Sequence, residues 1–316
     1  MKAFAYSSPR DFPTASKEVL RTGAVAKGAG TDLLELMKER VYEPNDVVSL
    51  LRAGDPPRQG EIGAVTTLAD LASDSWIGEN FPAVRIAAAT AATPQIRNVG
   101  TVGGNLCQHT RCWYFRNRDF PCFKRGTGAC SALEDGAHNR YHAIFRNDRC
   151  ASAHPSNLAP ALIAVGARVA CVHPAGDRTM DVELAYAEPG EGRFSDTGLR
   201  PGELIRTVLL EPSPLAKSST YVEFRERLSF DFAVASVAAA VHVLGGKVRD
   251  ARIVCGAVAP TPYRARAAED ALKGRALDPA AAAEAVVKGA EPLEQNRYKV
   301  VILKQLVRRA LEELRS

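Results

Sequence analysis

The stretch Arg97-Asn98-Val99-Gly100-Thr101-Val102-Gly103-Gly104-Asn105-Leu106 combines glycines with a threonine hydroxyl and an asparagine amide. Glycine lets a backbone approach a ligand closely, and the N–H groups of such a loop bind phosphate. A second glycine turn, Gly28-Ala29-Gly30-Thr31, lies about seventy residues earlier and leads into a predicted helix. Either turn alone is also compatible with a tight turn that binds nothing. Together they predict a pair of loops that holds the two ends of a dinucleotide pyrophosphate.

The surrounding pattern alternates between strands and helices. Asp32, with Glu35 three residues later, marks a helix start, and alanine dominates a predicted helix over 82–93. The other expected strands are 23–26, 46–51, 61–66, 167–172, 201–205, 220–224, 233–244 and 251–258, and the other expected helices are 67–71, 154–163, 263–273, 279–289 and 294–315. A cluster of proline and serine over 212–217 predicts a boundary between domains 1–215 and 216–316.

Four cysteines, Cys112, Cys122, Cys130 and Cys150, follow the second glycine stretch with spacings C-x9-C, C-x7-C and C-x19-C. Zinc ribbons and fingers pair their ligands two to four residues apart, so an iron–sulfur cluster fits better. The alternative is that these cysteines are buried small apolar residues. That alternative is preferred for two others, Cys171 and Cys255, which lie within apolar strand patterns, whereas Cys107 is ambiguous and is assigned to the end of a preceding strand.

The segment 110–149 has no sustained period and is interpreted as an inserted loop. Packing alone would order such a loop only at high cost, and four thiolates on a metal cluster would anchor it. The arginines and lysines around the cysteines would offset the thiolate charge and raise the cluster potential, and the alternative is that they form a solvated basic loop. These residues are Arg111, Arg116, Arg118, Lys124, Arg125 and Arg149. The histidines at 109, 138, 142 and 154 could supply a nitrogen ligand, but they are expected to be plain surface residues.

Composition limits the class of protein. With 316 residues, 46% of them hydrophobic, the chain is long enough for two or three domains. A net charge of +5, without a basic run interleaved with aromatics, argues against nucleic acid as a partner. No signal peptide is visible, and the longest mainly apolar stretch, 232–244, is too short to span a bilayer. No Ser-His-Asp arrangement or paired carboxylate stands out, so no catalytic residue is predicted.

Five separated motifs resemble, in order, the FAD-binding medium subunit of the xanthine dehydrogenase and aldehyde oxidase family of molybdenum hydroxylases. They are Gly28-Ala29-Gly30-Thr31-Asp32-Leu33-Leu34, Ile62-Gly63-Ala64-Val65-Thr66, Arg97 to Leu106, Pro155-Ser156-Asn157-Leu158-Ala159-Pro160 and Gly256-Ala257-Val258-Ala259-Pro260. The cysteine-bearing insertion, about 108–152, is similar to one found in bacterial periplasmic aldehyde oxidoreductases and in 4-hydroxybenzoyl-CoA reductases. The run Gln108 to Phe115 resembles the aldehyde oxidoreductase type more closely.

The resemblance implies an α+β fold: a two-part FAD-binding domain of the PCMH/vanillyl-alcohol-oxidase type with an inserted iron–sulfur loop, then a smaller α+β domain similar to that of CO dehydrogenase flavoproteins. It also implies that Cys112, Cys122, Cys130 and Cys150 bind a 4Fe-4S cluster. By position, the residues implied to bind FAD are Lys27, Gly28, Ala29, Gly30, Thr31, Asp32, Leu33, Arg97, Thr101, Gly103, Gly104, Asn105, Leu106, Asn157 and Arg225.

The chain departs from the family pattern in three places. Ala29 occupies a position that is usually glycine, and Asn157 stands where the family usually has an aspartate that contacts FAD. Where the family often has a lysine near the flavin, this chain has Glu223, with Arg225 and Arg227 close by.

The family resemblance implies an electron-transfer subunit. A large partner subunit would oxidise an aldehyde at a molybdenum cofactor, and a small 2Fe-2S partner would relay electrons to FAD and onward to an external acceptor. The complex would be a heterotrimer or its dimer. It would be periplasmic by co-export with a signal-bearing partner, or cytoplasmic. Two alternatives remain: a subunit of a 4-hydroxybenzoyl-CoA-reductase-like enzyme, in which electrons flow inward, and a zinc-binding scaffold protein whose glycine loops are plain turns.

Overall fold

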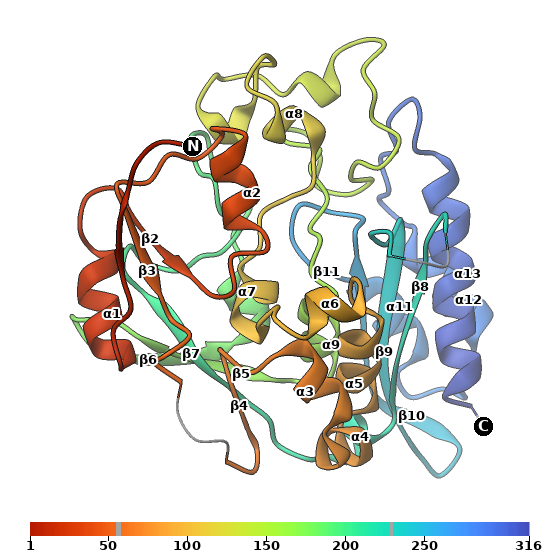
Figure 1. The fold of residues 1–316 in the computed structure, drawn as a ribbon. Helices are drawn as coiled ribbons and strands as arrows, with labels where there is room; N and C mark the ends of the chain where they lie inside the picture. Colours follow the sequence, from red (N-terminus) through yellow and green to blue (C-terminus); the bar gives the residue numbers. More distant parts are fainter. Residues whose placement is uncertain (55–57, 228–229, 316) are drawn as a thin grey trace.

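The computed structural model describes residues 1–54, 58–227 and 230–315, which fold into three sheets with helices around them (Figure 1). The first sheet has the order β1 (Ala5–Ser7), β3 (Asp46–Ser49), β2 (Ala24–Lys27), and both pairs are parallel. Parallel neighbours require crossover connections, which here contain α1 (Phe12–Val19) and α2 (Leu33–Lys38). The turn Gly28–Thr31 is therefore placed at the carboxyl end of a strand and directly before a helix.

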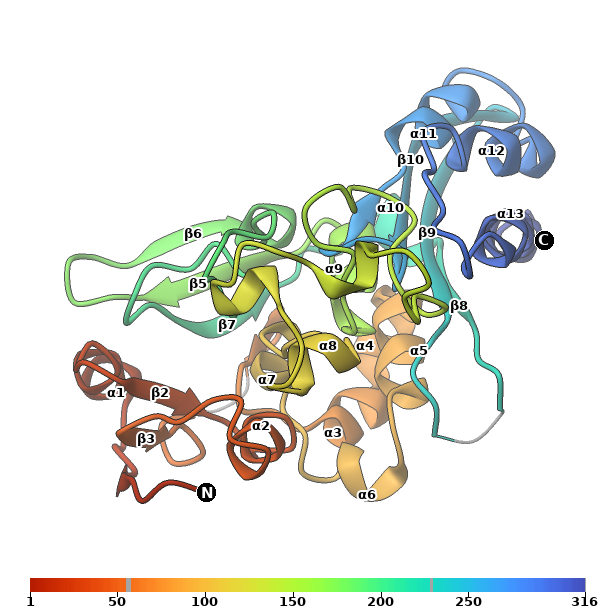
Figure 2. The same ribbon diagram turned by 90° about the horizontal axis from the view of Figure 1, so that it is seen from above.

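The second sheet is antiparallel and packs into the larger of the two main hydrophobic cores, which we call the N-terminal core. Its order is β4 (Glu61–Gly63), β7 (Leu204–Leu209), β5 (Arg168–Val172), β6 (Arg178–Asp181). The helical segments of this part are α3 (Leu68–Ser73), α4 (Ser75–Asn80), α5 (Pro82–Thr90), α6 (Pro94–Arg97), α7 (Val102–Leu106), α9 (Leu158–Ala164) and the 3-10 turn η3 (Val182–Ala185). Seen from above, α5 and α9 lie between this sheet and the third one (Figure 2).

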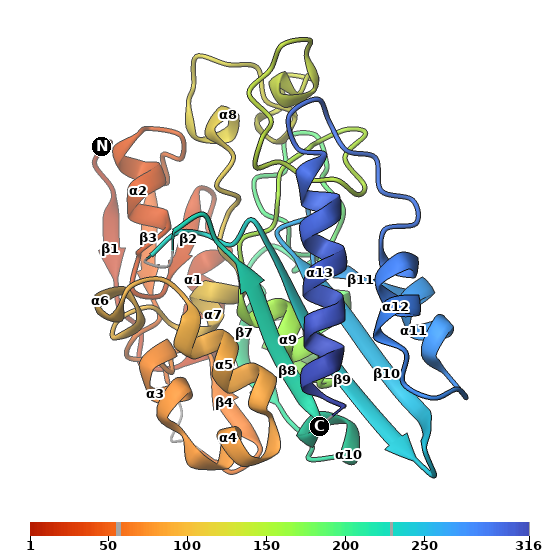
Figure 3. The same cartoon turned by 90° about the vertical axis from the view of Figure 1, so that its right-hand side faces the viewer.

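The third sheet has helices against both faces. Its antiparallel order is β11 (Tyr263–Arg264), β10 (Lys247–Gly256), β9 (Ala235–Leu244), β8 (Ser219–Phe224). Along β9, Ala238 and Ala240 belong to the core shared with α5 and α9, whereas Val237, Ala239 and Val241 belong to the core of the C-terminal helices. This alternation follows from the two-residue period of a strand. The C-terminal helices are α11 (Arg266–Leu272), α12 (Pro279–Val286) and α13 (Tyr298–Glu313), the last of which runs along the sheet (Figure 3).

The cysteine-bearing insertion lies at the top of Figures 1 and 3, beside both α2 and α13. It contains α8 (Trp113–Arg116) and two 3-10 turns, η1 (Phe123–Arg125) and η2 (Ser131–Leu133). Its end is anchored to the C-terminal domain, because the backbone N–H groups of Ile144 and Phe145 donate to the carbonyl of Val258, at 2.8 and 3.1 Å. Protein contacts therefore order this segment in addition to any metal.

A second anchor of the insertion is the buried ion pair of Lys124 with Asp196. The third is Lys299 of α13, whose ammonium is fully buried and donates to the carbonyls of Tyr141, His142 and Ala257 at 3.1, 2.9 and 2.6 Å. The sequence pattern indicated neither anchor.

The predicted α+β class is confirmed, and the predicted strands and helices are present with shifted ends. One prediction is wrong: the residues before Cys107 form α7, not a strand, and Cys107 is the C-cap of that helix. Asp32 precedes α2 as expected, but its side chain makes no capping hydrogen bond. The predicted boundary falls inside α10 (Pro214–Lys217), a short helix of the proline-rich segment. Within the described ranges, no helix is long and apolar enough to cross a membrane.

Candidate cofactor site

A cavity of about 550 Å³ lies between the turn after β2 and the segment 100–105. Most of the residues predicted to bind the cofactor line it, namely Lys27, Gly28, Ala29, Gly30, Thr31, Asp32, Leu33, Thr101, Gly104, Asn105 and Asn157. Apolar side chains cover other parts of the wall, among them Leu68, Ile96, Phe230 and Phe232. The cavity thus combines a glycine-rich polar end with apolar surfaces, as an elongated nucleotide requires.

The two glycine segments approach each other so closely that one of them has room only for glycine. A Cβ atom on Gly28 would lie 2.6 Å from the hydroxyl oxygen of Thr101, which is far inside van der Waals contact. Gly30 has a φ of +88°, in the left-handed region that favours glycine. The sequence therefore needs glycine at 28 for space and at 30 for backbone conformation, whereas Ala29 is tolerated.

Thr101 fixes the start of α7. Its hydroxyl accepts from the N–H of Gly104 at 3.1 Å, the usual hydrogen bond of an N-cap threonine. Gly103 packs away from the cavity, because a Cβ there would lie 3.0 Å from that of Ala64, and its N–H already donates to the carbonyl of Ala64. Gly103 is thus a packing residue of α7 that holds Thr101 and Gly104 in place.

Asn105 is held in one orientation by the segment before α9. Its Oδ1 accepts from the hydroxyl of Ser156 at 2.7 Å and from the N–H of Leu158 at 3.3 Å. Because the oxygen is occupied in this way, the amide Nδ2 is the atom left to donate to a ligand in the cavity.

The remaining predicted cofactor residues lie outside the cavity wall, and the structure gives each another partner. Arg97 donates to the carbonyls of Ala91 and Ala92 at 2.9 and 2.8 Å, which caps the end of α5. Leu106 is buried in the N-terminal core. Arg225 pairs with Glu223 and donates to the carbonyl of Thr90.

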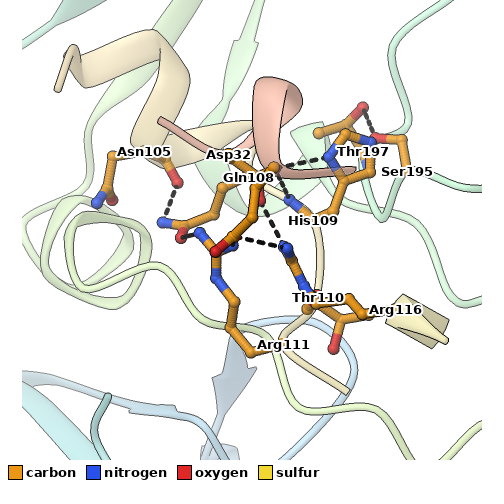
Figure 4. Close-up of polar contacts among 10 residues, drawn as sticks. Asp32, Asn105, Gln108, His109, Thr110, Arg111, Arg116, Ser195 and Thr197 are labelled. Carbon is orange, nitrogen blue, oxygen red and sulfur yellow. Dashed lines mark hydrogen bonds and ion pairs between the residues drawn. The ribbon is translucent and has the colours of Figure 1, made fainter. Parts of the chain in front are cut away.

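Further polar residues that the sequence prediction did not assign to the cofactor also line the cavity: Glu35, Thr93, Gln108, Arg111, Arg116 and Asp231. Gln108, Arg111 and Arg116 come from the start of the insertion. Figure 4 shows the two guanidinium groups meeting the carboxylate of Asp32, which lines the same cavity. The concentration of arginine near Cys112 was the available signal, but it was interpreted only as compensation for thiolate charge.

Asn157 lines the cavity and belongs to a partly buried polar network. Its Nδ2 donates to the hydroxyl of Tyr221 and to Oε2 of Glu223, both at 3.0 Å. Burial raises the pKa of Glu223, although the charge of Arg225 opposes this shift. The amide of Asn157 can donate to a carboxylate, which an aspartate at the same position could not do while ionised. The two departures from the family pattern therefore fit each other.

The four predicted metal cysteines are neighbours. The backbones of Cys122 and Cys130 form an antiparallel bridge, and the thiol of Cys150, which interacts electrostatically with Cys130, donates to the hydroxyl of Ser152 at 3.4 Å. Cys112 is within electrostatic reach of the other three. Burial raises the pKa of the Cys112 thiol to about 12, so at neutral pH a cation is needed to hold it as a thiolate. Among the described residues, no group of three or more His, Cys, Asp or Glu residues converges on a single ion position.

The other cysteines and histidines lie as follows. Cys171 and Cys255 are buried in the two apolar cores, as predicted. His142 places Nε2 3.2 Å from the sulfur of Cys112, and burial lowers its pKa to about 4. His154 is buried against Tyr186, with ring centroids 4.9 Å apart, and neither of its ring nitrogens has a hydrogen-bond partner among the residues that the structure describes. The prediction of surface positions is wrong for His142 and His154, because both are buried. Burial lowers the pKa of His154 to about 3.

Comparison with known proteins assigns the chain to a family. Residues 2–212 match the model of the FAD binding domain in molybdopterin dehydrogenase, and residues 219–314 match the CO dehydrogenase flavoprotein C-terminal domain. The chain belongs to this family of FAD-binding subunits. It is 33% identical to the aldehyde oxidoreductase FAD-binding subunit PaoB of Escherichia coli K12, over 100% of this chain and 99% of that protein.

Other members of the family of FAD-binding subunits cover the whole chain too. The carbon monoxide dehydrogenase medium chain of Afipia carboxidovorans is 26% identical over 99% of this chain and 97% of its own. The structure also resembles that of carbon monoxide dehydrogenase from Hydrogenophaga pseudoflava, with a TM-score of 0.74, 27% identity and coverage of 98% of this chain and 96% of that one. These relatives are subunits of oxidoreductase complexes.

The residues present fit the FAD of this family. The turn leaves space for a pyrophosphate at Gly28, where a Cβ would fill it, and its backbone is exposed to the cavity at Gly30. The guanidinium groups of Arg111 and Arg116 supply positive charge that suits the same group. Gln108, Asn105 and Asn157 supply further polar atoms along the wall. In this FAD-binding subunit, the cysteine insertion is therefore also a part of the flavin site.

Proposed function

We propose that this chain is the FAD- and iron–sulfur-containing electron-transfer subunit of a molybdenum-dependent aldehyde oxidoreductase. The proposal depends mainly on the insertion. Its four cysteines, Cys112, Cys122, Cys130 and Cys150, are neighbours in the structure. The same insertion contributes Arg111 and Arg116 to the wall of the flavin cavity. The full-length similarity to an aldehyde oxidoreductase subunit supports the choice of aldehyde as the substrate class. The chain itself would hold no catalytic acid, base or nucleophile.

In this proposal, FAD and a 4Fe-4S cluster supply electron transfer when bound, since flavin exchanges electrons singly or in pairs and the cluster singly. The residues of the chain bind and position these groups. Gly28, Thr101 and Asn105 hold the dinucleotide, and the four cysteines hold the cluster. Lys124 lies fully buried two residues after Cys122 and contributes positive charge close to the thiolates.

The partners belong to the proposal as well. A large molybdenum-cofactor-binding subunit would oxidise the aldehyde, a small 2Fe-2S subunit would deliver the electrons, and an external acceptor would remove them. The assembly would be a heterotrimer or its dimer. We also propose that the complex reaches the periplasm with a signal-bearing partner, with cytoplasmic retention as the alternative, and cell fractionation distinguishes the two.

Cofactor analysis of the full chain tests this function. After anaerobic reconstitution with iron, sulfide and FAD, we expect flavin absorption, iron and acid-labile sulfide in the protein. Replacing any one of the four cysteines by serine should lower the iron content, whereas Cys171→Ala and Cys255→Ala should leave it unchanged. A Cys112→Ser variant with a full complement of iron would contradict the assignment.

The same protein separates the alternatives. A zinc scaffold would be colourless and would retain zinc without flavin. For a 4-hydroxybenzoyl-CoA-reductase-like subunit, the chain in complex with its partners would be reduced by ferredoxin and not by aldehyde. Reduction of the flavin by aldehyde through the partner subunits is the result that the proposal requires.

A further inference from the structure

Asp32 belongs to two sites at once. It is the residue between the glycine turn 28–31 and α2, and it lines the flavin cavity. Its carboxylate nevertheless makes no hydrogen bond to the N-terminal turn of α2. Instead, both oxygens accept from the insertion, as Figure 4 shows.

The donors to Asp32 come from one short segment of the insertion. Oδ2 accepts from the backbone N–H of His109 at 2.9 Å and from its ring Nδ1 at 2.7 Å. Oδ1 accepts from Nη1 of Arg111 at 2.6 Å and from Nη2 of Arg116 at 2.5 Å. We call this set, Asp32 with His109, Arg111 and Arg116, the Asp32 clasp.

The clasp surrounds Cys112 in the sequence and fixes its surroundings. Arg111 directly precedes this cysteine, and Arg116 ends α8, which starts directly after it. Arg116 also donates from Nε to the carbonyl of Thr110 at 2.9 Å, so its guanidinium connects Asp32 to the backbone beside Cys112. The position of a cysteine of the cluster therefore depends on a carboxylate of the flavin turn.

In the Asp32 clasp, the buried carboxylate and its cationic partners stabilise each other. The side chain of Asp32 is only 13% exposed. Burial acts to raise its pKa, but the hydrogen bond from His109 and the charge of Arg111 outweigh burial and hold the pKa well below its usual range. A buried carboxylate of this kind is stable only with its cationic partners in place. Arg111 and Arg116 both line the flavin cavity, and Asp32 is the buried carboxylate that they share.

We propose that Asp32 is a positioning residue that couples the flavin site to the cysteine insertion, so that occupation of one cofactor site favours occupation of the other. This inference rests on the proposed function, because it needs both cofactors to bind. Coupling of this kind is reciprocal: the factor by which the cluster improves FAD affinity equals the factor by which FAD improves cluster retention.

The chain offers a matched control in Glu35 of α2, three residues after Asp32. Its Oε2 contacts the same two arginines, Arg111 at 3.2 Å and Arg116 at 2.8 Å, but its side chain is 60% exposed. Solvent screens such a pair, so its loss changes little in the position of the insertion. Because Glu35 also lines the cavity, its replacement is allowed to change the FAD dissociation constant itself. It should not change the ratio of the constants for the loaded and the iron-free protein.

The test measures the FAD dissociation constant of the full chain twice, with the insertion loaded with iron and sulfide and with it iron-free. For the wild type and for Glu35→Gln, we expect FAD to bind about tenfold more tightly to the loaded protein, within the usual range of coupling between sites. For Asp32→Asn, the two constants should agree within about twofold, and Asp32→Glu should restore part of the ratio. Because each ratio is taken within one variant, a general loss of stability cancels.

Equal constants for the loaded and iron-free wild type would overturn the coupling while leaving the proposed function intact. So would a wild-type ratio that persists in Asp32→Asn. Failure of the wild type to take up iron or FAD would instead refute the proposed function. If Asp32→Asn does not fold, His109→Ala and Arg116→Gln each remove donors of the clasp and should lower the same ratio.

Discussion

Gly28 and Thr101 meet across the flavin cavity, with space for a hydrogen atom but not for a methyl group between the Gly28 backbone and the Thr101 hydroxyl. A Cβ atom at position 28 would lie 2.6 Å from Oγ1 of Thr101. Thr101 cannot easily retreat, because its hydroxyl caps α7 through Gly104. The distance between the two glycine segments at this edge of the cavity is therefore limited by one contact between residues that are far apart in the sequence.

Replacing Gly28 by alanine should weaken FAD binding by about tenfold or more, equivalent to about 1.4 kcal/mol, because either the turn or Thr101 must move. Fluorescence titration of flavin into the apoprotein measures the effect. Gly198→Ala is the matched control, since nothing lies closer than 3.7 Å to a Cβ there. An alanine variant at 28 with unchanged affinity would show that the two segments separate readily.

Replacing Asn157 by aspartate, the residue usual in the family, should be harmful here. The new carboxylate would face Glu223, whose Oε2 lies 3.0 Å from the present amide nitrogen. The loss of a donor and the repulsion should cost about 2 kcal/mol of unfolding free energy and lower FAD occupancy. Denaturant unfolding and flavin content measure the two effects.

A second substitution checks this reason. Glu223→Gln in the Asn157→Asp background restores a donor and removes one charge, so it should recover most of the stability. If the double variant is as unstable as the single one, the repulsion is not the cause.

Lys299→Met should loosen the insertion, because it removes the donor to the carbonyls of Tyr141, His142 and Ala257. Unpaired buried acceptors cost about 1–3 kcal/mol in total stability. Limited proteolysis should then cut within 110–149 earlier than in the wild type. Lys304→Met on the same helix removes only a surface pair with Glu284 and should change stability by less than about 1 kcal/mol.

His154 should make the stability of the chain sensitive to mild acid. Burial lowers its pKa to about 3, whereas an unfolded histidine has a pKa of about 6.5. Between these values only the unfolded state binds the proton, so stability is complete above about pH 6.5 and falls as the pH decreases. His154→Phe keeps a ring against Tyr186 without a titrating group.

Between pH 7 and pH 5, the wild type should lose about 2 kcal/mol more than His154→Phe. Guanidinium unfolding of the cofactor-free chain at both pH values measures this difference. Parallel losses in the two proteins would mean that the imidazole is solvated or paired in the folded state.

Local sequence patterns were sufficient to predict most helices and strands and the types of residue that form the site. Glycine turns, alternating strands and clustered cysteines act over a few residues, so they are visible without knowledge of the fold. The helix α7 was missed because its paired glycines are poor helix formers. The N-cap position of Thr101 was the signal that could have revealed it.

Long-range partners were beyond the reach of those patterns. Nothing around Asp32 indicates that its side chain turns from the helix to Arg111, which lies 79 residues later. Arg97 and Arg225 were assigned to the cofactor from position alone, yet both guanidinium groups donate to partly buried carbonyls at the end of α5. Which polar group a side chain reaches depends on tertiary packing and not on its neighbours in sequence.

The buried pair of Lys124 with Asp196 has an evolutionary consequence. Loss of either partner leaves a lone charge in the interior, at a cost of about 3–5 kcal/mol, whereas joint replacement by apolar residues is tolerated. Positions 124 and 196 should therefore covary in evolution. Among homologues that carry the cysteine insertion, a change at one of these positions should be inherited together with a change at the other.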